Sequence, residues 1–156
     1  MSVQVGKKAP EFTLFSSEKK EVKLSDFRGQ NVLIHFFPQA FTGVCTNQLC
    51  EARDNMAVYQ KLNAQVIGIS VDSVFTLGKF KEENSYAFPL LSDFNKKVIK
   101  KYDAYLKDFV FGMQGVSKRA AFVVDKKGVI RYAEILANAG ELPNFVAIKE
   151  TLNSLS

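Results

Sequence analysis

Two short apolar runs, Val32–Phe37 and Val66–Val71, lie on either side of a segment with helical spacing, and this alternation constrains the fold most. Each run has the length and composition of a buried strand. The segment between them repeats apolar residues at intervals of three and four: Leu49, Ala52, Met56, Tyr59 and Leu62. This spacing predicts a helix over Cys45–Leu62. A strand, a helix and a second strand in this order predict an α/β fold with a partly parallel sheet.

The remaining segments extend this pattern at both ends. A polar turn between Glu11–Phe15 and Glu21–Leu24 predicts an N-terminal hairpin. A later hairpin, with a turn at Gly128, makes the predicted sheet mixed. The other predicted elements are a helix at 77–84, a strand at 88–91, a helix at 96–102, hairpin strands at 121–125 and 129–133, and a helix at 143–155. We therefore expect a single domain over residues 1–156, with a central mixed sheet flanked by helices.

Composition limits the partners and the compartment. The net charge is +5, but the 21 basic residues are mixed with 16 acidic ones, and no basic strip carries interleaved aromatics. This mixture is typical of a solvated surface, so we expect no nucleic-acid partner. No segment reads as a secretion signal or a membrane span, which predicts a soluble, cytoplasmic protein with no membrane partner. Two cysteines in such a compartment are reactive or inert thiols more often than a structural bridge.

Cys45 occupies the position where a reactive thiol is most plausible. It follows a loop that begins at Pro38 and leads from a buried strand into the predicted helix. The first N–H groups of a helix have no helical partner, and the helix dipole adds partial positive charge there. A cysteine at this position commonly has a lowered pKa, and its thiolate is the nucleophile. The alternative is that Cys45 is a small buried hydrophobic residue.

Pro38, Thr42 and Cys45 reproduce the Pro-x-x-x-Thr-x-x-Cys motif, and in this respect the chain resembles the peroxiredoxins. Further segments resemble this family in order along the chain: Gly6–Phe12, Ile67–Asp72, Phe88–Asp93 and Phe122–Asp125. The resemblance implies a thioredoxin-like fold and a thiol peroxidase that reduces hydrogen peroxide and organic hydroperoxides. The Cys45 thiolate would attack the peroxide and become a sulfenic acid. We expect no cofactor and no metal.

The resemblance also implies that Arg119, just before the Phe122–Asp125 segment, lies beside Cys45. A guanidinium keeps its charge and can bind both a thiolate and a peroxide oxygen. The peroxide would then be held by Thr42, Arg119 and the backbone N–H groups of Val44 and Cys45. Without the resemblance, Arg119 would be interpreted as a surface cation.

Cys50 lies five residues after Cys45, a spacing that resembles the Q-type, or bacterioferritin-comigratory, peroxiredoxins. There the second thiol attacks the sulfenic acid and forms an intramolecular disulfide, which a thioredoxin-like dithiol donor reduces. In a straight helix, Cα atoms five positions apart are about 8–9 Å apart. A disulfide requires about 7 Å or less, so the first helical turns would have to unwind. Other segments resemble the alkyl hydroperoxide reductase E group, which implies a one-cysteine cycle with an external thiol.

Several residues and functions stay open at this point. The single histidine, His35, lies in an apolar strand and is interpreted as a satisfied core residue. Gln48 either orients the Cys45 loop or is a solvated helix residue. Gly112 and Gly115 flank a segment that is interpreted as a mobile loop. A non-enzymatic peroxide sensor or chaperone, and a plain thiol–disulfide oxidoreductase, are the competing functions. A homodimer is compatible with the sequence.

Overall fold

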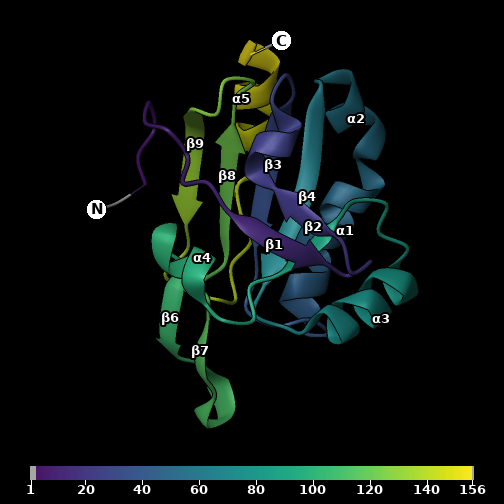
Figure 1. Ribbon diagram of the computed structural model, residues 1–156, viewed down its shortest axis with the longest axis vertical. Coiled ribbons are helices and arrows are strands. Elements are labelled where there is room, and N and C mark those ends of the chain that lie inside the picture. The colour runs from purple at the N-terminus through teal and green to yellow at the C-terminus, as the bar shows by residue number, and fades with distance from the viewer. Residues whose placement is uncertain (1–2, 156) are drawn as a thin grey trace.

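The computed structural model describes residues 3–155, except for the side chains of Val44 and Cys45. A seven-stranded mixed sheet has the order β2-β1-β5-β4-β3-β8-β9 (Figure 1). Its strands are β1 (Thr13–Ser16), β2 (Glu21–Lys23), β3 (Asn31–Phe36), β4 (Ala64–Ser70), β5 (Leu90–Ser92), β8 (Ala120–Val124) and β9 (Ile130–Ile135). The helices are α1 (Gly43–Asp54), α2 (Met56–Lys61), α3 (Val74–Asn84), α4 (Lys97–Lys101) and α5 (Phe145–Leu155), with a short 3-10 turn at Leu24–Phe27. The predicted α/β fold and N-terminal hairpin are confirmed.

The central strands pair as the apolar runs predict. Strand β3 pairs in parallel with β4 and antiparallel with β8, so it is enclosed on both edges. All six of its residues are buried. A strand covered on both faces needs apolar side chains in both directions, which explains why this run shows no alternation with polar residues.

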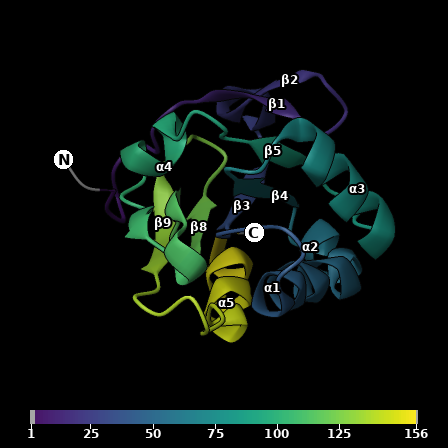
Figure 2. The same cartoon turned by 90° about the horizontal axis from the view of Figure 1, so that it is seen from below.

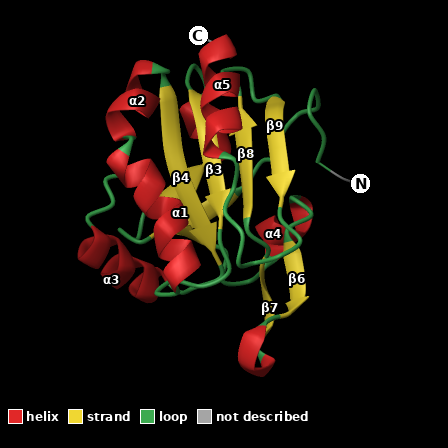
Figure 3. Ribbon diagram, turned by 180° about the vertical axis from the view of Figure 1, so that it is seen from behind, coloured by secondary structure: helices red, strands yellow, loops and turns green. Residues whose placement is uncertain are grey.

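Helices and loops cover the sheet on its two faces. In Figures 2 and 3, α1, α2 and α5 lie together on one face, while α4 and the N-terminal segment lie on the other. The side chains of β3 divide in the same way, because successive residues of a strand point to opposite faces. Val32, Ile34 and Phe36 pack with the α4 side, and Leu33, together with Phe37 just after the strand, packs with α1 and α5. The protein therefore has two apolar cores with β3 between them.

Gly68, in β4, allows the side chains of Leu90 and Phe37 to pack close to the sheet backbone. A Cβ atom built at this position would lie 2.8 Å from Leu90 Cδ2 and 3.3 Å from Phe37 Cε1. It would also lie 3.5 Å from Leu49 Cδ2, on α1. The distances to Leu90 and Phe37 are shorter than an unstrained methyl contact, whereas the distance to Leu49 is an ordinary van der Waals contact, so a methyl group here would displace Leu90 and Phe37.

Two segments differ from the sequence-based prediction. The helix predicted over 45–62 is divided into α1 and α2, with Asn55 ending the first; its side-chain amide donates to the Glu51 carbonyl. The loop predicted around Gly112 and Gly115 is a two-stranded sheet of β6 (Tyr105–Asp108) and β7 (Gln114–Ser117), joined by a 3-10 turn. These strands are short and mostly polar, so they lack the apolar run that identifies a buried strand.

Within residues 3–155, no helix combines the length and the apolar character that crossing a bilayer requires.

Candidate active site

Strand pairing brings three distant parts of the chain to one edge of the sheet. Strand β3 runs toward this edge and leads through Pro38 into α1. Strand β8 is antiparallel to β3, and its first residue, Ala120, pairs with Phe36. Arg119, which precedes Ala120, is therefore at the same edge as the loop that leads to Cys45. The carboxyl ends of parallel strands commonly carry the chemistry of α/β proteins.

The loop from Pro38 to Thr42 is held by contacts with the end of β4. Pro38 is buried, and the Ala40 N–H donates to Asp72 Oδ2 at 2.8 Å. The Ser70 hydroxyl donates to the same Asp72 oxygen at 2.6 Å. Burial raises the pKa of Asp72, while these hydrogen bonds act in the opposite direction. The Asp72 carboxyl thus links the end of β4 to the loop that follows β3.

Thr42 precedes the first turn of α1, at the N-cap position. Its hydroxyl donates to the Gln39 carbonyl at 3.2 Å rather than capping the helix. The first helical bond runs from the Thr46 N–H to the Thr42 carbonyl at 3.0 Å. The N–H groups of residues 43–45 therefore precede the helical ladder and can point at an incoming anion. The hydroxyl oxygen of Thr42 also stays available as an acceptor.

Cys45 is the third residue of α1, so its backbone lies in the turn whose N–H groups are free of helical bonds. This is the helix position that the sequence predicts for the reactive cysteine. The side chains of Cys45 and Val44 lie outside the described part of the structure, and their predicted roles stay predictions.

Arg119 is a buried cation. Its side chain is 2% exposed, its Nη1 group donates to Gln48 Oε1 at 2.9 Å and its Nε group donates to the Ala139 carbonyl at 3.0 Å. Among the described residues, no carboxylate forms an ion pair with it. Gln48 lies three residues after Cys45 on α1, so the guanidinium is next to the first turns of this helix. The alternative of a surface cation is wrong.

Gln48 is fully buried and connects Arg119 to His35. Its side-chain nitrogen lies 2.9 Å from His35 Nδ1 and also faces the carbonyls of Phe36 and Ala120 at 3.3 and 3.4 Å. Two carbonyls require a donor and Arg119 requires an acceptor, so the orientation of the amide is fixed. The interpretation of Gln48 as a solvated helix residue is wrong.

His35 is neutral in this arrangement. Burial, with a smaller effect from the Arg119 charge, lowers its pKa to about 3. Since Nδ1 accepts a hydrogen bond from Gln48, Nε2 carries the proton. Nε2 is buried without a partner among the described residues. The interpretation of a satisfied core histidine therefore holds for only one of the two ring nitrogens.

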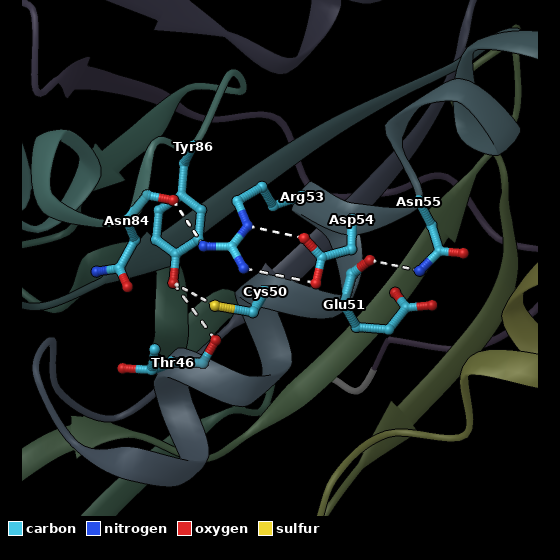
Figure 4. Close-up of polar contacts among 8 residues, drawn as sticks. All are labelled: Thr46, Cys50, Glu51, Arg53, Asp54, Asn55, Asn84 and Tyr86. Carbon is cyan, nitrogen blue, oxygen red and sulfur yellow. Dashed lines mark hydrogen bonds and ion pairs between the residues drawn. The ribbon is translucent and has the colours of Figure 1, made fainter.

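Cys50 is half-buried on the face of α1 that contacts the chain segment after α3 (Figure 4). Its sulfur lies 3.6 Å from the Tyr86 hydroxyl. Helix α1 is continuous from Gly43 to Asp54, so both cysteines lie on one unbroken helix. With α1 in this state, a Cys45–Cys50 disulfide is excluded by the distance along the helix.

Asp72 and His35 are the supporting residues to which sequence reasoning assigned no role at the site. A signal for Asp72 was present, because it directly follows a buried strand at the edge where the site lies. No sequence signal connected His35 to Gln48, because their contact depends on how α1 lies against β3.

Comparison with known proteins decides the family. The sequence pattern of the AhpC/TSA family matches residues 5–133. The chain belongs to the AhpC/TSA family. A Mycobacterium tuberculosis protein named as a peroxiredoxin is 40% identical over 131 residues, which are 83% of each chain. Peroxiredoxin Bcp of Bacillus subtilis is 35% identical over 129 residues, which are 82% of each chain.

The fold agrees with this membership. The crystal structure of peroxidoxin BcpB from Mycobacterium tuberculosis superposes with a TM-score of 0.88, at 24% identity and with 99% of both chains covered. At that identity the likeness concerns the fold alone, and it confirms the predicted thioredoxin-like fold. Membership in the AhpC/TSA family confirms the prediction of a peroxiredoxin, which is a thiol-dependent peroxidase.

Proposed function

We propose that this AhpC/TSA family member reduces hydrogen peroxide and organic hydroperoxides with the Cys45 thiolate as nucleophile. The sulfur attacks one peroxide oxygen, the O–O bond breaks, and the second oxygen leaves with a proton as water or an alcohol. Cys45 loses two electrons and becomes a sulfenic acid. Thr42, Arg119 and the N–H groups of Val44 and Cys45 hold the peroxide, and Pro38 shields the site from bulk water.

The buried Arg119 carries this proposal. Arg119 is 2% exposed, and no carboxylate among the described residues pairs with its guanidinium. Burying an unpaired charge in this way carries a desolvation penalty, which lowers the stability of the fold. An anion beside it offsets that cost, and the helix start that bears Cys45 is the position where an anionic sulfur is most favoured. Arg119 would stabilise the thiolate first and the charge on the departing oxygen afterwards.

For the second step, we propose that Cys50 attacks the Cys45 sulfenic acid. An S–S bond forms, the S–O bond breaks, and hydroxide leaves with the proton of the Cys50 thiol as water. Because α1 is intact in the structure, its first turns must unwind for this step. A thioredoxin-like dithiol then reduces the disulfide. We also infer that residues 1–156 act as one domain, since the N-terminal strands β1 and β2 and the later strands β8 and β9 belong to the same seven-stranded sheet.

Mass spectrometry of peroxide-treated protein tests these roles. Wild-type protein treated with stoichiometric hydrogen peroxide and then with a thiol-blocking reagent should contain an internal Cys45–Cys50 disulfide. Cys50→Ser should instead carry a sulfenic acid at Cys45, and Cys45→Ser should consume no peroxide. Peroxide consumption by Cys45→Ser at the wild-type rate would contradict the proposal.

A one-cysteine cycle is the second candidate, because Cys50 lies within an unbroken helix and contacts Tyr86. In that cycle an external thiol reduces the Cys45 sulfenic acid directly. A stable sulfenic acid in oxidised wild-type protein, with turnover unchanged in Cys50→Ser, would favour it. A peroxide sensor differs from both, since it would form the sulfenic acid without sustained turnover in the presence of a thiol donor.

A further inference from the structure

Three contacts join one face of α1 to the last residue of α3 and to Tyr86, which follows α3. The Tyr86 hydroxyl lies 3.4 Å from the Thr46 carbonyl and 3.6 Å from Cys50 Sγ. Arg53 Nη1 donates to the Asn84 carbonyl at 2.9 Å. Figure 4 shows Tyr86 and Asn84 facing Thr46, Cys50 and Arg53 of α1. The spacing of four and three residues places Thr46, Cys50 and Arg53 on one face of the helix.

The contacts of Tyr86 involve the turn that must open in the proposed second step. If the Cys50 S–H donates to the phenol oxygen and the phenol O–H donates to the Thr46 carbonyl, both contacts are satisfied together. In a helix the Thr46 carbonyl also accepts from the N–H of residue 50. The Tyr86 hydroxyl therefore stabilises both ends of the turn from Thr46 to Cys50.

The Tyr86 ring itself is held firmly. It is 3% exposed, stacks on Phe88 at a centroid distance of 5.2 Å and meets the edge of Phe80 at 5.4 Å. Phe80 in turn contacts Phe41, in the loop before Thr42, at 5.0 Å. A ring fixed on this side presents its hydroxyl at a defined position, so α1 must move away from Tyr86 when it unwinds.

We propose that Tyr86 is a positioning residue that holds Cys50 and the Thr46–Cys50 turn in the helical state, and so sets the rate at which Cys50 reaches oxidised Cys45. This inference rests on the proposed resolving role of Cys50. The step that Tyr86 opposes is the one in which the Cys50 sulfur bonds to the Cys45 sulfur and water leaves. Loss of the hydroxyl favours the unwound state.

Tyr86→Phe tests this directly, because it removes the hydroxyl and keeps the ring packing. Rapid quenching followed by mass spectrometry measures the sulfenic acid and the disulfide after stoichiometric hydrogen peroxide. The rate of disulfide formation, divided by the rate of sulfenic acid formation, should rise about 2- to 10-fold, the effect of one hydrogen bond on an equilibrium. Amide hydrogen exchange over residues 46–50 of the reduced protein should accelerate by a similar factor.

Tyr59→Phe is the matched control. The Tyr59 hydroxyl donates to Glu51 Oε1 at 2.8 Å, so this variant also loses one phenol contact to α1, but beyond Cys50. It should leave both the rate ratio and the exchange of residues 46–50 at the wild-type values. A general loosening of the protein would instead change Tyr59→Phe and Tyr86→Phe alike, and would overturn the inference.

The outcomes separate this inference from the proposed function. If wild-type protein forms the internal disulfide and Tyr86→Phe forms it at the same rate or more slowly, Cys50 is the resolving thiol and the role of Tyr86 is wrong. If neither protein forms the disulfide, the resolving role of Cys50 fails, and with it the effect of Tyr86 on the cycle. Amide exchange then still tests whether the Tyr86 hydroxyl stabilises the helix. Unchanged exchange over residues 46–50 in Tyr86→Phe would show that it does not.

Discussion

At the residue scale, Arg119 combines burial, charge and a fixed orientation. Its guanidinium contacts Gln48 Oε1 and the Ala139 carbonyl, and both are neutral acceptors. A lysine would keep the charge but has a single ammonium in place of the planar array of five donors. We therefore expect that this position requires an arginine, and not only a positive charge.

Arg119→Lys should lower the second-order rate constant for peroxide by about 100-fold, the typical effect of losing one donor to the charge that develops in the transition state. The measurement is the oxidation of reduced protein by hydrogen peroxide in stopped flow. Arg131→Lys is the control, because Arg131 pairs with Asp125 and is half-exposed, away from Cys45 in the sequence and the sheet. Equal rates in wild type and Arg119→Lys would exclude Arg119 from the site.

His35 should make the protein less stable in acid. Its pKa is lowered to about 3 in the folded state by burial and Arg119, whereas an unfolded histidine has a pKa of about 6.5. Between these values the unfolded chain binds more protons, so stability falls as the pH falls from about 6.5 toward 3. Each pH unit in this window should remove about 1.4 kcal/mol from the free energy of unfolding.

Urea unfolding at pH 7 and pH 5 measures this effect in wild type and His35→Phe. The wild-type protein should lose more stability between the two pH values than the variant, whatever the absolute cost of the substitution. Parallel losses in the two proteins would show that His35 does not control the acid sensitivity.

At the scale of the elements, the proposed cycle requires α1 to be helical before oxidation and partly unwound in the disulfide form. In the structure it is continuous from Gly43 to Asp54, and the N–H groups of its first turn have no helical partners. In the proposed disulfide form the same turns cannot be helical, because the two cysteines would be too far apart. Thr46 and Asn47, in the first half of this helix, are polar and not buried, which is compatible with such a change, whereas Gln48 would have to leave its contacts with Arg119 and His35.

Oxidation should therefore remove amide protection from residues 43–50 and leave α5 protected. Hydrogen exchange of peroxide-treated protein, followed by peptide mass spectrometry, measures both helices in one experiment. Cys50→Ser treated in the same way serves as the control, since it cannot form the disulfide and should keep α1 protected. Full protection of α1 in a protein that contains the disulfide would contradict the unwinding.

Gly68, in β4, affects the site through its packing against Phe37. A methyl group there would lie within 2.8 Å of Leu90 Cδ2 and would press on Phe37, which leads into the active-site loop. Gly68→Ala should lower the free energy of unfolding by about 1–3 kcal/mol through overpacking. Urea unfolding measures the loss; Gly43→Ala, where the added Cβ meets no atom within 4 Å, is the control. Equal stability of wild type and Gly68→Ala would be contrary to the close packing.

The sequence predicted most of the sheet because the strands that form its centre are apolar on both faces. Val32–Phe37 and Val66–Val71 differ from β3 and β4 by only a few residues at the ends. The small β6–β7 sheet was missed, since its strands are short and mostly polar and carry no periodic signal. The break at Asn55 was missed for a different reason: the apolar spacing continues through it, while a side-chain bond to the Glu51 carbonyl ends α1.

The site was predictable to the extent that it depends on local sequence. The loop after β3 and the helix start that bears Cys45 follow directly from the chain order. The burial of Arg119 depends on the antiparallel pairing of β8 with β3, and the contact of Gln48 with His35 depends on helix packing. Such contacts join residues 13 to 72 positions apart, which no local pattern encodes.

At the scale of the whole molecule, exposed aromatic side chains gather at one groove. Phe15, Phe75 and Phe94 are 51%, 72% and 62% exposed, and all three line it. The groove includes Ser73 and Val74, which directly follow Asp72, the residue that holds the active-site loop at Ala40. Exposed apolar clusters of this kind commonly mark protein interfaces. We expect a second copy of the chain to cover this face.

Sedimentation of the reduced protein should accordingly give twice the mass of the chain, and Phe75→Glu should shift it toward the single chain. Phe111→Glu is the control, because Phe111 is 96% exposed in the turn between β6 and β7, outside the groove. A wild-type protein that sediments as a single chain at all concentrations would refute the dimer.

The ionisation of Cys45 at neutral pH is the claim on which the peroxidase chemistry depends, and its alkylation rate measures it most directly. In Cys50→Ser the only thiol is Cys45, so the rate of iodoacetamide modification as a function of pH reports its titration alone. We predict an apparent pKa well below the value of about 8.5 for a free thiol, rising when Arg119 is replaced by lysine or glutamine. A titration near 8.5 that is the same with and without Arg119 would contradict the role of both residues.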